Sequence, residues 1–494
     1  QIREFVKAAG AKVQTNGIRS ALLDKFAYDK NLNEAIAMAA ANHQKLQSKY
    51  GHLLRMDEDK ACTEVQNGFL QFYDANALNP YIPIAAKGPW IITAHGNVLY
   101  DTGGYGMLGL GQNPDALSPA LHGNQVIANI MTPSISQYAF QQAIRAEIGH
   151  TRGNKCPYEN FICLNSGSES VTLGMRIADA HSKKMTAPGA PNAGRKACIV
   201  SLKGSFHGRT ERPSYASDST MPKYKAHLKS FEDVIPNFTV EPNNVEDLHR
   251  VFEQLTKEGY HAEIMLIEPC MGEGNPGELT TPEFYKAARE VTRKHHSLLL
   301  VDSIQAGLRA QGVLSVVDYP GFQGLDAPDF ETYSKALNSG QYPMSVLAMG
   351  PKIADIYVRG LYGNTMTTNP RALDVAVSVL SAITPELRRN IVEQGTRIVS
   401  ELDRKLKTKY PNVVVANKGS GMLFATHIDS KYVAYGTQNS LEMIARRNGL
   451  GAIHGGKNAL RFTPVFAMTN DEADLVVDLV DQSIADMLKV QNVQ

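Results

Sequence analysis

The sequence predicts an α/β protein, in which a mostly parallel sheet is flanked by helices, joined to a smaller α+β domain and preceded by a helical extension. Between about residues 126 and 375, short apolar runs alternate with amphipathic stretches at helical spacing. This alternation is typical of parallel strands connected by helices. Polar residues directly follow several of the runs, as expected at the carboxyl edge of such a sheet.

The apolar runs of this central region are the predicted strands. They cover residues 161–164, 197–202, 264–267, 297–301 and 345–349. Short apolar runs bounded by turn residues fit strands that are buried on both faces. The stretches between them, such as 245–258 and 282–295, have the apolar spacing of amphipathic helices.

The patterns divide the chain into four segments. Residues 1–78 are partly alanine-rich, with apolar residues at helical spacing, and we predict a helical extension. Residues 79–125 contain a predicted hairpin and form the first part of a small domain. Residues 126–375 form the large domain. Residues 376–494, with long amphipathic helices followed by shorter strands, complete the small domain.

Composition limits the classes of function. The chain has 494 residues, of which 43% are apolar and 20% charged, which is ordinary for a globular enzyme. The formal net charge is +1, so no global field would attract nucleic acid or an anionic membrane. No apolar run is long enough for a membrane span, and we expect none.

The cysteine pattern bears on redox environment and metals. The 5 cysteines are scattered without a metal-binding spacing, so we predict no metal site. An odd count in a chain of this size favours reduced thiols. We therefore expect an intracellular, reducing compartment, either the cytoplasm or the mitochondrial matrix.

A glycine-dense loop occupies residues 103–111. It lacks the Walker spacing and the terminal Lys-Ser/Thr pair, so it does not predict a nucleotide-binding loop. Glycines at this density allow backbone to approach a ligand or another chain closely.

The central chemical feature is an acid and an amine near one sheet edge. The run 298–301 ends in Asp302, and Lys335 follows about thirty residues later. Pyridoxal phosphate needs such a pair, because an amine forms a Schiff base with its aldehyde and an acid keeps its pyridine nitrogen protonated. The alternative is an aspartate that caps a turn and a solvated surface lysine.

Other strand ends carry further candidates. Gly167 and Ser168 open a predicted helix, where backbone N–H groups suit a phosphate, although a simple serine-capped helix is the alternative. Phe206 follows another strand and could lie flat on a planar ring, or belong to the core. Glu268 and Glu273 flank a turn after a third strand and could also be solvated. Their convergence on one edge favours a functional site.

These motifs, in this order, resemble the class III (ω-amino) aminotransferases. That family consists of fold type I pyridoxal-phosphate enzymes and includes ornithine, acetylornithine, lysine and 4-aminobutyrate aminotransferases. The resemblance runs from about Pro80 to the C-terminus. It is carried by Asn165-Ser166-Gly167-Ser168-Glu169, Phe206-His207-Gly208-Arg209-Thr210, Glu268-Pro269 with Gly272-Glu273-Gly274, Asp302 with Ile304-Gln305, Ser334-Lys335-Ala336-Leu337, Thr365 and Arg461-Phe462-Thr463-Pro464.

The resemblance implies roles around the cofactor ring. Lys335 would bond to the aldehyde and move a proton between the substrate carbon and the cofactor. Asp302 would pair with the pyridine nitrogen, and Gln305 with the phenolic oxygen. Ile304 and Phe206 would pack on opposite faces of the ring.

The resemblance also implies phosphate contacts and a partner subunit. Gly167 and Ser168 would offer backbone N–H groups to the phosphate, and His207 and Glu268 would complete the cofactor site. Thr365 would reach the phosphate of the neighbouring subunit. A homodimer is therefore expected, and the extension could support a larger assembly.

For the substrates, the resemblance implies an amino-acid or amine donor and 2-oxoglutarate. Arg461 would bind a substrate carboxylate, Glu273 would pair with Arg461 when the donor is bound, and Tyr105 would line the entrance. The alternatives on the same scaffold are an aminomutase, a decarboxylating transaminase, and a catalytically idle structural or regulatory protein.

Some positions depart from the family pattern. Ser303 stands where glutamate is frequent, Arg309 lies one place earlier than usual, and Thr367 and Thr368 replace two common glycines. None of these removes an expected cofactor contact. They indicate an unusual subgroup, so the sequence does not fix the amino donor.

Overall fold

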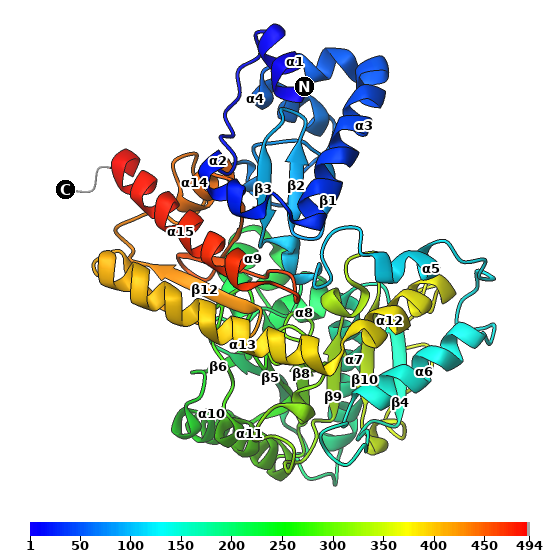
Figure 1. The fold of residues 1–494 in the computed structure, drawn as a ribbon. Helices are drawn as coiled ribbons and strands as arrows, with labels where there is room; N and C mark the ends of the chain where they lie inside the picture. The colour runs from blue at the N-terminus through cyan, green and yellow to red at the C-terminus, as the bar shows by residue number, and fades with distance from the viewer. Residues whose placement is uncertain (492–494) are drawn as a thin grey trace. The chain divides into compact units, whose positions relative to one another are not determined.

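The computed structural model describes residues 1–491, and they form two compact units (Figure 1). The first unit comprises Gln1–Asp115 with Asn390–Gln494, and the second comprises Ala116–Arg389. No helix in residues 1–491 is both long and apolar enough to cross a membrane. Within the same range, no group of His, Cys, Asp and Glu side chains could hold a metal ion.

The second unit contains a seven-stranded sheet in the order β4-β10-β9-β8-β7-β5-β6. The strands are β4 (Asn160–Leu164), β5 (Lys196–Leu202), β6 (Asn237–Val240), β7 (Tyr260–Ile267), β8 (Leu298–Asp302), β9 (Phe330–Tyr333) and β10 (Ser345–Met349). Neighbouring strands from β9 to β6 are parallel, and β10 runs antiparallel to both β4 and β9. The predicted fold class, a mostly parallel sheet flanked by helices, is confirmed.

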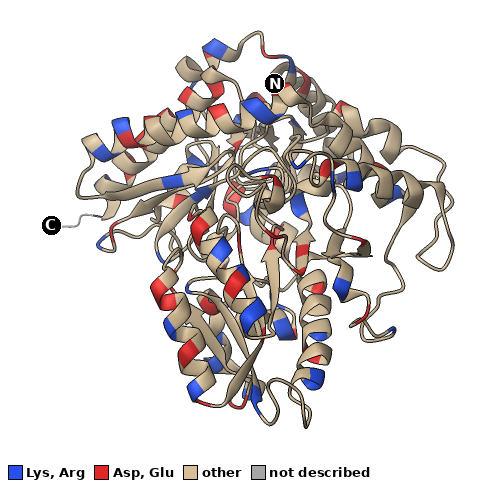
Figure 2. Cartoon of the chain, turned by 90° about the horizontal axis from the view of Figure 1, so that it is seen from below, with Lys and Arg blue, Asp and Glu red and all other residues tan. Residues whose placement is uncertain are grey.

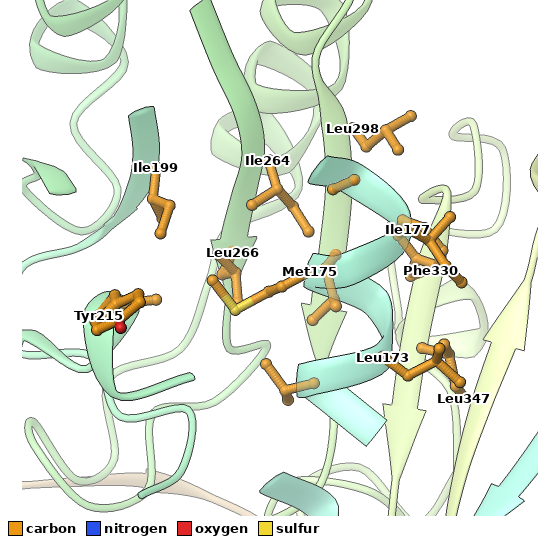
Figure 3. Packing of buried hydrophobic residues seen from close by; sticks show 14 of the residues in the cluster. Leu173, Met175, Ile177, Ile199, Tyr215, Ile264, Leu266, Leu298, Phe330 and Leu347 are labelled. Carbon is orange, nitrogen blue, oxygen red and sulfur yellow. The ribbon is translucent and has the colours of Figure 1, made fainter. Parts of the chain in front are cut away.

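Helices lie on both sides of this sheet. They are α5 (Ser118–Leu121), α6 (Ile135–Glu147), α7 (Gly167–Met185), α8 (Glu211–Ala216), α9 (Met221–His227), α10 (Val245–Lys257), α11 (Pro282–Lys294) and α12 (Pro370–Ala382). Figure 3 shows α7 lying across the sheet, with Leu173, Met175 and Ile177 packed towards strand residues such as Leu266 and Leu347. Burying this face fixes α7, and therefore its N-terminus, against the sheet.

The first unit contains two smaller sheets. One has the order β1-β2-β3-β13 and the other β11-β12-β15-β14. The strands are β1 (Pro83–Lys87), β2 (Trp90–Thr93), β3 (Val98–Asp101), β11 (Val414–Ser420), β12 (Leu423–Ile428), β13 (Leu450–Gly451), β14 (Ile453–Gly455) and β15 (Ala459–Phe462). The predicted hairpin is present as the antiparallel pair β2 and β3.

The helices of the first unit come from both ends of the chain. They are α1 (Ile2–Ala8), α2 (Ser20–Leu23), α3 (Lys30–Leu54), α4 (Glu58–Gln66), α14 (Leu441–Arg447) and α15 (Asn470–Gln491), while α13 (Pro385–Leu402) crosses the division between the units. The amide of Asn42 on α3 donates to the Ile84 carbonyl of β1 at 2.8 Å. The Trp90 indole donates to Asp29, the N-cap residue of α3, at 3.0 Å.

The observed division differs from the predicted segments. The predicted boundaries fall after residues 125 and 375, whereas the units divide after Asp115 and Arg389. The reason lies in packing: α5 contacts α12, and the Gln125 amide donates to Asp374 on α12 at 2.8 Å. Residues 1–78 are also part of the first unit, because α3 packs on β1 and β2.

Charged side chains of both signs are interspersed along the described helices. Figure 2 shows basic and acidic residues alternating at short intervals on the helices of that view. This distribution agrees with a formal net charge of +1.

Candidate active site

The candidate residues of the second unit lie just beyond neighbouring strands. Phe206 and His207 follow β5, Glu268 follows β7, Asp302 ends β8, and Lys335 follows β9. These strands are adjacent and parallel in the order β9-β8-β7-β5. Their carboxyl ends therefore deliver all five side chains to one edge of the sheet.

A buried hydrogen bond joins Asp302 to His207. His207 Nδ1 lies 2.8 Å from Asp302 Oδ2, and the His207 side chain is fully buried. Because an ionised carboxylate only accepts hydrogen bonds, Nδ1 is the donor. The other ring nitrogen, Nε2, is buried without a hydrogen-bond partner among residues 1–491. The imidazole thus supports the negative charge of Asp302.

Lys335 is held in an unusual backbone conformation. Its φ is +47°, in the left-handed region that lysine rarely occupies. The preceding Ser334 hydroxyl donates to the Met344 carbonyl at 2.6 Å, which holds the turn. The Lys335 amine lies 3.1 Å from Gln305 Oε1. Such strain persists where the surrounding structure fixes a functional side chain.

Glu268 ties two loops together. One of its carboxyl oxygens accepts from the Phe206 backbone N–H and the other from that of Gly272, each at 3.0 Å. Burial raises the pKa of Glu268 to about 7, although these hydrogen bonds and His207 oppose the shift. Asp302 adds to the shift because two like charges disfavour each other.

The N-terminus of α7 lies against the same group of loops. Ser166 and Glu169 form a capping box at this end, so the helix begins at Gly167. A Cβ at Gly167 would lie 2.5 Å from Ile304 Cδ1, and a Cβ at Gly208 would lie 2.2 Å from Ser168 Oγ. Both glycines therefore allow approaches that no other residue permits.

Thr210 was not among the predicted site residues. Its hydroxyl lies 2.6 Å from the Ser168 hydroxyl, and its backbone N–H donates to the same oxygen at 3.1 Å. The signal was present in the sequence, since Thr210 ends the motif that begins at Phe206.

Arg209 is a second residue without a predicted role. Its guanidinium lies 3.3 Å from Glu273 Oε1 and 5.3 Å from the centre of the Phe206 ring. Both partners of this ion pair are partly exposed, at 40% for Arg209 and 31% for Glu273. Within the second unit, Glu273 therefore pairs with Arg209.

The remaining predicted residues lie elsewhere. Thr365 is exposed on the segment before α12, and its carbonyl accepts from the Asn129 amide at 3.0 Å. Arg461 and Tyr105 belong to the first unit. Arg461 is buried in β15, opposite Ala425 of β12. Tyr105 has φ +51° and is 44% exposed.

One departure from the family pattern, Ser303, has a local explanation. The Ser303 hydroxyl donates to the buried carboxylate of Glu331 at 2.6 Å. The same carboxylate accepts from Tyr158, Ser315 and the Val316 backbone N–H. A glutamate at position 303 would bring a second acid beside it. Thr368 has φ +58°, a conformation that glycine adopts freely.

Comparison with known proteins decides the family. The model of the aminotransferase class-III family matches residues 72–484, most of the chain. The chain belongs to the class III aminotransferases. It is 27% identical over 337 residues to the acetylornithine aminotransferase of Prochlorococcus marinus, covering 67% of this chain and 75% of that protein. It is also 27% identical over 435 residues to that of Vibrio parahaemolyticus, covering 86% of this chain and 99% of that protein.

Solved structures of the same fold include two named aminotransferases. The ornithine aminotransferase of Toxoplasma gondii superposes with a TM-score of 0.73 at 21% identity, covering 90% of this chain and 98% of that chain. The acetylornithine aminotransferase of Elizabethkingia anophelis gives a TM-score of 0.69 at 21% identity, covering 87% and 99%. Because both structures are only 21% identical to this chain, their structural similarity supports the fold alone.

The cofactor of this class III aminotransferase is pyridoxal phosphate, and the residues present fit it. The buried Asp302 carboxylate is supported by a histidine, which suits a protonated ring nitrogen. The Lys335 amine is fixed near Gln305 by a strained turn. The closeness of Gly167 to Ile304 leaves no room for a side chain at the start of α7, where backbone N–H groups suit a phosphate.

Proposed function

We propose that this class III aminotransferase moves the ω-amino group of a small amino acid or diamine to 2-oxoglutarate, forming glutamate. The donor class is ornithine, N-acetylornithine, lysine or 4-aminobutyrate. One observation carries the proposal: Lys335 with Gln305, and Asp302 with His207, are paired at adjacent strand ends of one unit. The acetylornithine and ornithine aminotransferases among the relatives support this donor class.

Individual residues of the chain have different roles in the proposed reaction. Bound pyridoxal phosphate supplies the electron sink for breaking the C–H bond at the amine-bearing carbon. The Lys335 amine holds and moves the proton at that carbon, because it is the basic group fixed at this edge of the sheet. Asp302 holds the proton on the pyridine nitrogen, and His207 holds Asp302 in place.

Two arginines are the candidates for a substrate carboxylate. Arg209 lies over the Phe206 ring and pairs with the partly exposed Glu273. A carboxylate of the incoming substrate would replace Glu273 as its partner, since a guanidinium binds carboxylates bidentately. Arg461 has the same chemistry and is the residue that the family resemblance assigns to 2-oxoglutarate.

The active form is a dimer. An exposed apolar patch, the 126–138 patch, lies in the second unit and consists of Val126, Ile127, Ile130, Met131, Ile135 and Tyr138. Met131 is 86% exposed and Ile135 is 85% exposed, which is unusual for a surface in contact with water alone. Asn129, within the patch, donates to Thr365. A second copy on this patch would therefore lie next to Thr365, the residue expected to serve the neighbouring site.

A donor panel tests the proposed function. Each donor is incubated with the enzyme, pyridoxal phosphate and 2-oxoglutarate, and glutamate is measured. At least one donor should give glutamate in step with 2-oxoglutarate consumed, and Lys335→Ala should abolish it. The matched control is Lys352→Ala, because Lys352 is exposed in a turn after β10.

Other outcomes would overturn parts of the proposal. Donor consumption without loss of 2-oxoglutarate would indicate an aminomutase. Release of carbon dioxide from the donor, with a keto acid still consumed as the amino acceptor, would indicate a decarboxylating transaminase. For the dimer, Ile135→Asp should yield an inactive monomer in analytical ultracentrifugation, and an active monomer would contradict the role of the 126–138 patch.

A further inference from the structure

Residues 11–17 form an irregular strap near the N-terminus, and a buried carboxyl group is one of several groups that hold it. Residues 11–17 have no regular secondary structure. Glu58, at the start of α4, accepts from the backbone N–H groups of Gln14 at 2.9 Å and Thr15 at 2.8 Å, both through Oε2. Asp57 accepts from the Lys12 N–H at 2.9 Å. The strap is therefore attached to α4 mainly through acidic side chains.

The other oxygen of Glu58 faces a histidine. Glu58 Oε1 lies 3.9 Å from His95 Nδ1, and both side chains are fully buried. Neither atom has a hydrogen-bond partner among residues 1–491. His95 Nε2 lies 3.1 Å from the Met56 carbonyl oxygen, which can only accept, so Nε2 carries a hydrogen. In a neutral imidazole, Nδ1 is then a bare acceptor.

This arrangement requires a proton. An ionised Glu58 and a neutral His95 would point two acceptors at each other in a buried site, which is unfavourable. One proton, on either Oε1 or Nδ1, turns the contact into a donor–acceptor pair. We propose that Glu58 and His95 share one proton in the folded protein, and that this proton helps to hold Gln14 and Thr15 against α4, an arrangement that we call the latch.

One strap residue, Gln14, lines a cavity of about 1010 Å³ in the first unit. Gln14, Pro80 and Tyr105 all line it. The Gln14 side-chain amide donates to the Pro80 carbonyl at 3.0 Å, so the strap is part of the cavity wall. Release of the latch would open this wall beside Tyr105, a residue expected at the substrate entrance.

The sign of the pH dependence follows from burial. Burial raises the pKa of Glu58 above the ordinary carboxyl value, against the effect of its two backbone hydrogen bonds and His95. The folded protein therefore keeps a proton that the unfolded chain releases. The stabilisation is complete below the ordinary carboxyl pKa and is lost as pH rises through the raised value.

Other charged groups surround the pair. Cys62 lies one turn further along α4, and burial raises its thiol pKa to about 12, with Glu58 and Asp59 adding to the shift. Burial lowers the pKa of Arg447, and the nearby Glu58 opposes this shift. Further charged side chains near the pair are Asp57, Asp59 and Lys60, at the start of α4. Lys45 of α3 lines a second cavity together with His95. Arg3 donates hydrogen bonds to Gly96 and Asn97, which follow His95 in the chain.

Hydrogen exchange of the strap tests the latch. The full-length holoenzyme is exchanged between about pH 5 and pH 9, and protection of the Gln14 and Thr15 amides is corrected for intrinsic rates. Between the ordinary carboxyl pKa, which Glu58 has in the opened state, and the raised pKa of the folded pair, protection in the wild type should fall by about tenfold per pH unit, because opening releases one proton. Above the raised pKa the profile should level off. A wild-type profile that does not change with pH would overturn the proposal.

Two variants replace the proton with a permanent donor. In Glu58→Gln, the side-chain oxygen can still accept from the strap while the amide donates to His95 Nδ1, so protection should become independent of pH. His95→Gln offers an amide donor from the other side and should give the same flat profile. Asp59→Asn is the matched control, because Asp59 is exposed in the same turn of α4, and it should behave as the wild type. If protection in both glutamine variants fell with pH as in the wild type, the proposal of a shared proton would be wrong.

Discussion

Within residues 1–491, two pairs of a carboxyl group and an imidazole have both side chains fully or almost fully buried, one pair in each unit, and they differ in how they are satisfied. In the second unit, Asp302 and His207 are 2.8 Å apart and directly hydrogen bonded. In the first unit, Glu58 and His95 are 3.9 Å apart, and their facing atoms have no other hydrogen-bond partner among residues 1–491. The Asp302–His207 pair is organised to hold a fixed negative charge, whereas the Glu58–His95 pair needs a proton to be stable. Burial alone thus does not determine what such a pair does.

The largest expected effect comes from removing the acid of the satisfied pair. Asp302→Ala should lower kcat/KM by about 10³-fold or more, because a preorganised charge at the reacting group is lost. Steady-state kinetics with the best donor of the panel measures it. The matched control is Asp326→Ala, since Asp326 is an exposed acid that pairs with Arg293. Near-wild-type activity in Asp302→Ala would mean that the pair has no catalytic role.

Removing the imidazole should have a smaller effect. His207→Phe deletes a hydrogen bond to a charged group, worth roughly 2 kcal/mol, so kcat should fall by about 10- to 100-fold. His207→Asn restores an N–H donor near the Nδ1 position and should recover part of the loss. If the asparagine variant were no better than phenylalanine, His207 would contribute through packing rather than through its hydrogen bond.

Glu268 is a buried carboxyl group that accepts hydrogen bonds from two backbone N–H groups rather than from an imidazole. Its pKa is about 7 in the folded state because of burial. The proton bound there stabilises the fold fully below the ordinary carboxyl pKa, and this stabilisation is lost as pH rises through about 7. The free energy of unfolding should therefore fall by up to about 3 kcal/mol between about pH 5 and pH 8. The Glu268→Gln substitution should remove this pH dependence of the free energy of unfolding, as measured by urea denaturation, even if the variant is less stable at every pH.

The smallest effect concerns a carboxylate satisfied by hydroxyl donors. Ser303→Ala leaves Glu331 with one donor fewer and should lower the free energy of unfolding by about 1–2 kcal/mol. Ser381→Ala is the matched control, because Ser381 is exposed on α12. An unchanged stability in Ser303→Ala would show that the remaining donors to Glu331 compensate fully.

Much of the large sheet could be predicted, because its strands are continuous apolar runs. The exceptions are instructive. β6 (Asn237–Val240) escaped prediction since it is short and includes polar residues, and the reversed direction of β10 leaves no mark on periodicity. The division after Asp115 could not be read from composition, since it follows from contacts between segments that are far apart in the chain, such as that of Gln125 with Asp374.

The candidate site shows the same limit. A strand that ends in Asp302 and a lysine about thirty residues later are visible in sequence, whereas the short strand β9 that precedes this lysine was not predicted. The hydrogen bond between His207 and Asp302 could not be predicted from the sequence, because the two residues lie 95 positions apart and only the order of the strands brings them together. The same holds for Glu58 and His95, which no spacing connects. The catalytic and cofactor roles assigned to individual residues stay predictions.

The central claim is that Lys335 is the residue that carries the cofactor. Reduction of the holoenzyme with borohydride, followed by peptide mapping with mass spectrometry, tests it most directly. We predict a pyridoxyl group on Lys335 in the wild type, and none on any peptide of Lys335→Ala. A pyridoxyl group on another lysine, or none in the wild type under conditions where the enzyme is active, would contradict the account.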